Sequence, residues 1–515
     1  MPSNPPKSET WRFLLALGII VLLSFFLGLG SAPLFDVDEG AFSEATREMI
    51  VGKNYLTTYL NGAPRFDKPI LIYWLQALSV RGFGLSEFAF RLPSALAGSL
   101  WASAMFIFAR KLSGNRQAFL ATAMLVLSLQ VTVIAKAAIA DALLNCFLAI
   151  TMLAVLHHFR TGSKHSMLLA FGAAGFGMLA KGPIAIIIPL AVCTLFALQD
   201  GTLKIWLKRI VNPIGIAIFL LIALPWYLLE YRDQGMAFIE GFFLKHNVNR
   251  FSTSFEGHSG SLFYYIPVII IGLMPFTGLL FSVLFNLKKL LPDRTNRFLA
   301  IWVVFVFLFF SLSGTKLPHY MIYGYTPLFL LMARALPESK HPERLALWPG
   351  VLLALLIFLP QIVKTLMPNF TDPYILALLA GAIELTGPTH MVIVTLALLG
   401  LTAIQFIPRF SPSDKLVGAG VIFALLINLH LMPVAGRLLQ QPVKDAALMA
   451  KKEGLKIVMW KLYNPSFLVY SESFVEKRAP RPGETVLTTI RELNTLENPD
   501  VLYQKYGIVL AKLMP

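Results

Sequence analysis

Long apolar stretches recur along most of this chain, and short polar connectors separate them. A helix that crosses a bilayer needs about 20 largely apolar residues, so each long stretch is a candidate span. We therefore expect residues 1–435 to form an all-α, polytopic membrane domain. The pattern predicts about thirteen spans, near residues 12–31, 90–109, 117–135, 140–159, 167–180, 183–199, 210–229, 263–285, 298–313, 319–333, 345–364, 389–407 and 414–433.

The charge of the connectors predicts the orientation of the chain across the membrane. Cytoplasmic loops of membrane proteins collect Lys and Arg, and here every second connector is basic if the N-terminus is cytoplasmic. This orientation places residues 32–89, residues 230–262 and the C-terminal tail outside, which in a bacterium is the periplasmic side of the inner membrane. The basic residues of the six inward connectors are Arg110, Lys111 and Arg116; Arg160 and Lys164; Lys204, Lys208 and Arg209; Lys288, Lys289, Arg294 and Arg297; Arg334, Lys340 and Arg344; and Arg409 and Lys415.

Composition agrees with a membrane protein. Of the 515 residues, 56% are hydrophobic and 14% are charged, which is too apolar for a soluble protein of this size. The net charge of +16 is first explained by basic loops of a membrane protein, so nucleic acid is not an expected partner. Cys146 and Cys193 lie in apolar segments and indicate no disulfide framework. The apolar run at 12–31 is longer than the core of a signal peptide, about 7–15 residues, so we expect an uncleaved helix.

The first outward connector, residues 32–89, gathers charge beside the membrane surface. Ionisable groups at a membrane boundary are costly and often functional, which makes this connector the main candidate for chemistry. Its charged candidates are Asp36, Asp38, Glu39, Asp67 and Lys68.

The same connector predicts two short helices. The first follows Asp38, ends near Gly52 and has opposite apolar and charged faces, so we expect it to lie on the membrane. Asp38 is at its N-terminus, where the helix dipole favours an ionised carboxylate. Residues 70–80 are too short to span, and Tyr73 and Trp74 suit an interfacial helix. The two faces of the first helix are Phe42, Ala45 and Met49 against Glu44, Arg47 and Glu48.

Two other charged residues in apolar surroundings, Asp141 and Lys181, each have two possible roles, and a pair of histidines is a third candidate. Asp141 opens a predicted span, where it either caps the helix or contacts substrate, and Lys181 either reaches to the interface or binds substrate. His246 and His258 lie twelve residues apart in one outward connector and are tentative ligands of a divalent metal, although no ligand spacing supports this. We expect no other cofactor.

The composition changes after about residue 436, and residues 436–515 predict a small α/β domain outside the membrane. Helices are predicted at Lys444–Glu453 and Thr485–Leu496, and strands at Lys456–Trp460, Phe467–Tyr470 and Gly507–Ala511. This domain has no Gly-rich phosphate loop.

The run from Asp38 to Met49 resembles the start of the first periplasmic loop in the aminoarabinose transferases that modify lipid A. These enzymes belong to a wider protein O-mannosyltransferase-like group with the GT-C fold. The resemblance covers most of residues 10–335. It continues through Asn61-Gly62, Phe66-Asp67-Lys68-Pro69, Tyr73-Trp74, Arg91-Leu92-Pro93-Ser94, Asp141, Lys181-Gly182-Pro183, Pro225-Trp226-Tyr227, His246 to Phe251, Tyr264-Tyr265 and Lys316-Leu317-Pro318-His319-Tyr320.

The resemblance implies a glycosyltransferase that moves a sugar from a polyprenyl-phosphate donor to lipid A, another glycan or a protein at the periplasmic face. Asp38 matches the family's essential acidic residue and is the expected catalytic carboxylate. Such a reaction also needs cations to stabilise the departing phosphate, and Lys68, Arg250 and Lys316 are assigned to that role. The remaining expected substrate-binding residues are Glu39, Asp67, Asp141, Lys181, His246 and Tyr320.

The chain departs from the family pattern at Ala41, Arg65 and Asp67, which leaves the sugar and the acceptor open. The alternative function is a transporter or flippase of lipid-linked sugars without covalent chemistry. A transporter typically carries ionisable groups near the bilayer midplane or an internal repeat. Here the charges gather at the outer interface and no repeat is found, which favours the enzyme.

Overall fold

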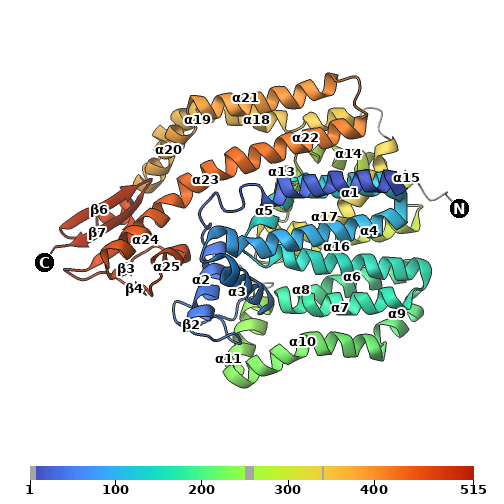
Figure 1. Cartoon of the computed structure of the whole chain (residues 1–515), viewed down its shortest axis with the longest axis horizontal. Coiled ribbons are helices and arrows are strands. Elements are labelled where there is room, and N and C mark those ends of the chain that lie inside the picture. The colour runs from blue at the N-terminus through green and yellow to red at the C-terminus, as the bar shows by residue number, and fades with distance from the viewer. Residues whose placement is uncertain (1–6, 250–259, 339–341, 515) are drawn as a thin grey trace.

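A bundle of long helices forms most of the molecule, and a small β-sheet lies at one end of it (Figure 1). The computed structural model describes residues 7–249, 260–338 and 342–514. Helix α1 begins at the end of the bundle opposite the sheet, whereas helices α2 and α3 of the first outward connector lie at the sheet's end.

The α-helices are α1 (Lys7–Val21), α2 (Asp38–Val51), α3 (Leu71–Phe83), α4 (Glu87–Leu127), α5 (Leu129–Lys136), α6 (Asp141–Thr161), α7 (Lys164–Lys181), α8 (Ile184–Gln199), α9 (Leu203–Ile210), α10 (Pro213–Gln234), α11 (Met236–Phe238), α13 (Tyr265–Gly272), α14 (Thr277–Phe285), α15 (Leu287–Leu290), α16 (Arg294–Leu312), α17 (Tyr325–Ala335), α18 (Gly350–Ile357), α19 (Leu359–Leu366), α20 (Pro373–Leu385), α21 (Pro388–Ala403), α22 (Pro412–Leu426), α23 (Met432–Leu439), α24 (Gln441–Glu453), α25 (Pro465–Ser471) and α26 (Ile490–Leu493). The tighter or wider helical turns are η1 (Leu22–Phe26), η2 (Ile239–Asn249), η3 (Pro318–Gly324), η4 (Leu336–Glu338), η5 (Pro342–Leu347), η6 (Met367–Asn369), η7 (Ile404–Phe406) and η8 (Ile427–Leu431).

Within the described residues, six helices are long and apolar enough to cross a membrane, or eight if each of two bent pairs is one span. The bent pairs are α13 with α14, at 115°, and α18 with the segment Leu359–Asn369, at 61°. Shorter apolar helices at Thr10–Phe26, Ile184–Gln199 and Pro373–Leu385 add to the bundle. The chain is therefore a mostly helical, multi-pass membrane protein.

The longest helix, α4, consists of two helices that meet at Gly114, whose φ of 81° is not helical. Forty-one residues of continuous helix would be about 60 Å long, roughly twice the hydrocarbon thickness of a bilayer. The break explains why the sequence predicts two apolar segments in this region.

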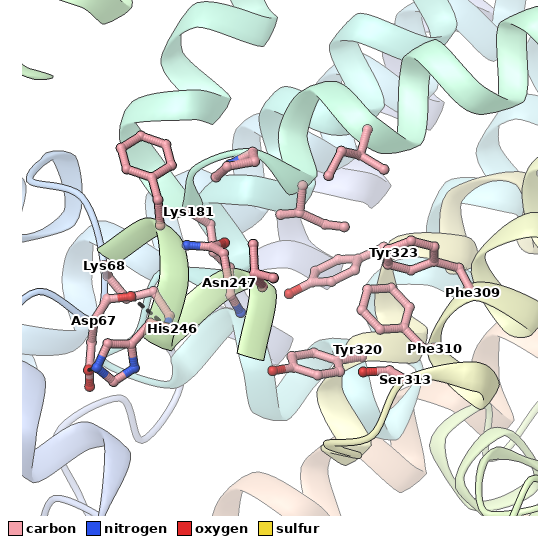
Figure 2. A pocket seen from close by; sticks show the side chains of 15 residues that line it. Asp67, Lys68, Lys181, His246, Asn247, Phe309, Phe310, Ser313, Tyr320 and Tyr323 are labelled. Carbon is pink, nitrogen blue, oxygen red and sulfur yellow. Dashed lines mark hydrogen bonds and ion pairs between the residues drawn. The ribbon is translucent and has the colours of Figure 1, made fainter. Parts of the chain in front are cut away.

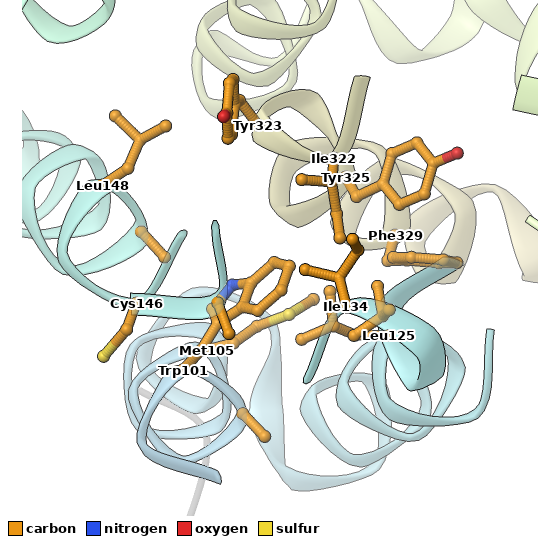
Figure 3. Packing of buried hydrophobic residues seen from close by; sticks show 14 of the residues in the cluster. Trp101, Met105, Leu125, Ile134, Cys146, Leu148, Ile322, Tyr323, Tyr325 and Phe329 are labelled. Carbon is orange, nitrogen blue, oxygen red and sulfur yellow. The ribbon is translucent and has the colours of Figure 1, made fainter. Parts of the chain in front are cut away.

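Small and bulky side chains interlock at the centre of the bundle. Trp101, Met105 and Leu125 of α4 pack with Ile134 of α5 and Tyr325 of α17 (Figure 3). The indole nitrogen of Trp101 donates to the hydroxyl of Thr326 at 2.7 Å, so the buried polar atom is satisfied. Buried alanines let helix backbones approach one another closely, which is how membrane helices gain packing energy.

The C-terminal region forms a five-stranded mixed sheet in the order β4-β3-β5-β7-β6, as expected of a small α/β unit. Strand β3 is parallel to β4 and β5, whereas β7 is antiparallel to β5 and β6. The strands are β3 (Ile457–Met459), β4 (Glu476–Lys477), β5 (Thr485–Thr489), β6 (Pro499–Lys505) and β7 (Ile508–Leu513), and a separate hairpin pairs β1 (Tyr59–Leu60) with β2 (Ala63–Pro64).

Two secondary-structure predictions in this region are wrong. The segment Phe467–Tyr470 is not a strand but part of helix α25, which Pro465 begins at a position that proline favours. The segment Thr485–Leu496 is not one helix but strand β5 followed by the single turn α26, because Thr485–Thr489 is rich in β-branched residues.

Helix α2 has nearly the predicted limits but not the predicted surroundings. Its supposed polar face is buried, with Glu44, Arg47 and Glu48 exposed by 0%, 6% and 8%. Two hydrogen bonds of 2.7 and 2.8 Å join Arg47 to Glu44, and the Glu48 carboxylate accepts the backbone N–H groups of Asn61 and Gly62. Because helix α25 also packs on α2, this helix does not lie on the membrane surface.

Candidate active site

Asp38 is the first residue of α2, and its side chain is exposed where two cavities meet. One is a small polar chamber that connects to a large apolar cavity, and the other lies against α5 and α23. Besides Asp38, the chamber is lined by Phe42, Arg65, Asp67, Lys68, Ile139, Asp141, Lys181, His246, Leu317, His319 and Tyr320.

Asp67 is the centre of one group of charges in the chamber. Its carboxylate contacts the Arg65 guanidinium at 3.0 Å and the His246 imidazole at 2.8 Å. Burial alone raises the pKa of Asp67, but Arg65, His246 and Lys68 together lower this pKa well below its usual value. The group therefore stays ionised, and the Nζ of Lys68 donates to the Asp67 backbone carbonyl at 3.0 Å.

Asp141 is the centre of a second group, at the start of α6. Its Oδ1 accepts hydrogen bonds from Lys181 at 2.5 Å and Tyr323 at 2.7 Å, and the His319 imidazole lies 3.8 Å away. Lys181 also lies over the rings of Tyr320 and Tyr323, 5.6 and 5.5 Å from their centroids. Lys181 is therefore folded inward against Asp141 and does not extend to the interface.

The chamber opens into an apolar cavity of about 490 Å³ (Figure 2). Asp67, Lys68 and His246 lie together on one side of it, and Tyr320 and Tyr323 lie on another. The cavity wall is built from helices α8 and α16 and the turns η2 and η3. Its apolar lining is Pro183, Ile184, Ile187, Phe243, Val248, Phe309 and Phe310.

The second cavity, of about 330 Å³, is also lined by Asp38. Its wall is formed by the segment that leads into α2, together with residues of α5 and α23. Its polar lining includes Asp36, Glu39, Arg91, Lys136 and His319, and its apolar lining includes Leu29, Val133, Ile134 and Met432.

The carboxylate of Glu39 is fully engaged in hydrogen bonds and an ion pair within the protein. Its two carboxylate oxygens contact the Arg91 guanidinium at 2.7 and 2.9 Å and accept the N–H groups of Phe35 and Ala138. Arg91 also donates to the carbonyl oxygens of Leu29, Ala32 and Pro33. This buried network fixes the chain just before α2 and favours an architectural role for Glu39 over contact with substrate.

The structure brings most of the predicted site residues into one chamber. Lys316 is an exception, because its buried Nζ donates to the carbonyl oxygens of Ser311 and Ser313 at 2.9 and 2.7 Å, and it lines neither the chamber nor the apolar cavity. Arg250 and His258 lie outside the described residues. The residues that meet in the chamber are Asp38, Asp67, Lys68, Asp141, Lys181, His246 and Tyr320.

His246 contacts Asp67, and the described part of the chain contains no group of three or more His, Cys, Asp or Glu side chains that could hold a metal ion. The proposed partner ligand, His258, is not described. His246 therefore lies in the chamber as a partner of Asp67.

Three contributors were not predicted from the sequence. Arg65 pairs with Asp67, Tyr323 donates to Asp141, and Asn247 lines the apolar cavity. The spacing of Tyr323 could have indicated its position. It follows Tyr320 by three residues in the 3₁₀ turn η3, where side chains three residues apart lie above one another.

Comparisons with known proteins show what the chain resembles. A family model described as dolichyl-phosphate-mannose-protein mannosyltransferase matches residues 67–228. The undecaprenyl phosphate-α-4-amino-4-deoxy-L-arabinose arabinosyl transferase of Aeromonas hydrophila is 32% identical over 62% of this chain and 59% of its own length. A Pseudomonas fluorescens enzyme with the same name is 26% identical over 97% of this chain and 89% of its own length. The match thus spans about three fifths of the Aeromonas relative and most of the Pseudomonas one.

Among solved structures, ArnT from Cupriavidus metallidurans, bound to undecaprenyl phosphate, matches with a TM-score of 0.79 and 19% identity. The match covers 99% of this chain and 98% of that one, so the two proteins share a fold from end to end. Together with the sequence matches, this shows that the chain is similar to these transferases in sequence and shares the fold of the ArnT structure.

Proposed function

We propose that this protein is a membrane glycosyltransferase that takes a sugar from a polyprenyl-phosphate donor and transfers it to an acceptor at the periplasmic face. The observation that carries the proposal is the position of Asp38, at the junction between a cation-lined chamber with an apolar extension and a second cavity. The names of the relatives point to undecaprenyl phosphate as the carrier and to an aminoarabinose-type sugar.

The donor fits the first cavity by its chemistry. Its polyprenyl chain takes the apolar part beside Phe243, Phe309 and Phe310, and its phosphate takes the polar chamber near Lys68 and Lys181. Cations at this point stabilise the negative charge that grows on the phosphate oxygen as the sugar leaves.

Asp38 acts as the general base. The acceptor oxygen attacks the anomeric carbon, the bond from that carbon to the phosphate oxygen breaks, and the acceptor proton moves to the Asp38 carboxylate. Polyprenyl phosphate leaves with the electron pair of the broken bond. A base in this position typically contributes about 10²–10⁴-fold to the rate.

The second cavity gives the acceptor its own approach to Asp38. Its mostly apolar wall suits a lipid better than a soluble glycan or a folded protein, and lipid A is the acceptor that the family resemblance suggests. Donor and acceptor would then reach Asp38 through different cavities.

Reconstituted protein should transfer sugar from purified lipid-linked donor to lipid A in liposomes without added nucleotide. Transfer is measured as the mass shift of lipid A. A strict need for a nucleotide sugar would contradict the proposed donor. Movement of the donor across the bilayer without any covalent product would instead support the alternative function of a flippase.

The proposed topology keeps thirteen spans, with residues 1–435 as the membrane domain and residues 436–515 as a periplasmic domain. Support comes from the six basic connectors and from the fact that α2, α3 and the C-terminal sheet lie at one end of the bundle. We expect single cysteines placed at the exposed residues Val51 and Lys512 both to react with an impermeant reagent added to spheroplasts. Reaction of one without the other would refute this count of spans.

A further inference from the structure

The turn that leads into Asp38 is held by the C-terminal domain. Oδ1 of Asp36 accepts the backbone N–H of Ser466 at 2.8 Å, and Oδ2 accepts the side-chain amide of Asn464 at 2.9 Å. The Ser466 hydroxyl also donates to Oδ2. Three donors from one short segment of the C-terminal domain therefore meet a carboxylate two residues before the proposed base.

Neighbouring contacts fix the same segment. The hydroxyl of Tyr470 accepts the backbone N–H of Leu34 at 2.7 Å and donates to Glu87 at 3.0 Å, and Lys444 pairs with Glu87 at 2.5 Å. The segment before the Asp36 turn and the start of α4 are thereby joined to α24 and α25.

A third contact lies further along the connector, after α2. The side chain of Asn61, next to hairpin strand β1, makes two hydrogen bonds with the backbone of Val475, at 2.7 and 3.0 Å. The C-terminal domain thus holds the connector both before α2 and after it.

Packing leaves the turn little freedom. A Cβ atom added to Gly40 would overlap both the Asp36 carboxylate and the backbone of Ser466. Only glycine allows α2 and α25 to come this close, and the buried face of α2 follows from the same contact.

We propose that the C-terminal domain positions the catalytic base, with Asn464 and Ser466 acting through Asp36 to set the place of Asp38. This inference rests on the proposed function, since it assigns a role relative to the transfer step. Asn464, Ser466 and Asp36 are positioning residues, whereas Asp38 is the group that meets the acceptor.

Loss of the contacts to Asp36 should lower the turnover number, kcat. Displacement of a catalytic group by about 1 Å can reduce a rate by about 10²-fold, so loss of the Asp36 contacts should lower kcat by about 10- to 100-fold. The donor KM should change by less than about threefold, because the phosphate-facing lysines Lys68 and Lys181 lie on other elements. A purely structural role would instead lower the Tm and the amount of active protein together.

The test uses the full-length protein in liposomes with purified lipid-linked donor and lipid A. The first variant is Asp36→Ala, and the second is the double variant Asn464→Ala with Ser466→Ala. The third exchanges the partners, Asp36→Asn with Asn464→Asp, which restores an amide–carboxylate hydrogen bond in the opposite sense. Lys451→Ala is the matched control, because Lys451 belongs to the same domain and pairs with exposed Glu472 at the surface.

The inference predicts a low kcat at near-normal Tm and donor KM for the first two variants, a substantial recovery of kcat in the exchanged pair and no change in the control. Unchanged kcat in Asp36→Ala would overturn it. Activity that falls only in step with Tm, with no recovery in the exchanged pair, would also overturn it. An inactive wild-type protein would count against the proposed function itself and is thereby distinguished from both results.

Discussion

Replacing Asp38 with asparagine should lower sugar transfer by at least about 10²–10⁴-fold, the usual contribution of a general base. Asparagine keeps the size of the side chain and suits a helix N-terminus, so α2 should still form. What the variant loses is the negative charge and the ability to take the acceptor proton. Transfer rate and Tm are measured together in detergent or liposomes, and the Tm should stay near that of the wild type.

The comparison variant is Lys68→Ala, which should act on donor binding. Hydrogen bonds to charged groups contribute about 1.5–3 kcal/mol, so the loss of one phosphate contact should raise the donor KM by about 10- to 100-fold. Lys456→Ala, at an exposed lysine of the C-terminal domain, controls for the loss of a positive charge. Near-normal turnover of Asp38→Asn at normal stability would mean that Asp38 is not the base.

The second large effect concerns stability. Arg91→Met should lower the free energy of unfolding by about 3–5 kcal/mol, because it leaves the Glu39 carboxylate buried without its partner. Both side chains of this pair are only 5% exposed, and Arg91 also satisfies three backbone carbonyl groups before α2. Denaturant titration of the purified protein in detergent measures the change.

A surface pair provides the matched control for that measurement. Lys451 and Glu472 form an ion pair with side chains exposed by 46% and 42%, and exposed pairs contribute about 0–1 kcal/mol. Lys451→Met should therefore have little effect. If Arg91→Met costs no more than Lys451→Met, the Glu39–Arg91 network does not support the loop as described.

Sequence patterns predicted the parts of the fold that follow from local chemistry. Helix α2 starts at Asp38 because a carboxylate suits a helix N-terminus, and it ends at Gly52 as the pattern indicates. The mixed character of the C-terminal region was also predictable. The burial of Glu44, Arg47 and Glu48 was not, because it depends on α25, which is more than 400 residues further along the chain.

The same limit applies to the candidate site. The motifs identified seven residues that line the chamber, because the segments that carry the motifs meet there. These residues are Asp38, Asp67, Lys68, Asp141, Lys181, His246 and Tyr320. The direction of a long side chain cannot be predicted from such a pattern. Lys316 donates instead to the backbone carbonyl groups of Ser311, in α16, and of Ser313. Arg65 was considered only as a departure from the family pattern, although it becomes the partner of Asp67.

The contact between Asp36 and Ser466 joins residues 430 positions apart. Residue 36 leaves the ribosome early in synthesis, whereas its partners are made near the end and, in the proposed orientation, must still be exported. A nascent or prematurely terminated chain would therefore insert its helices and bind donor lipid without an ordered base. Catalysis would begin only after translation and translocation are complete, so the last step of biogenesis also switches the enzyme on.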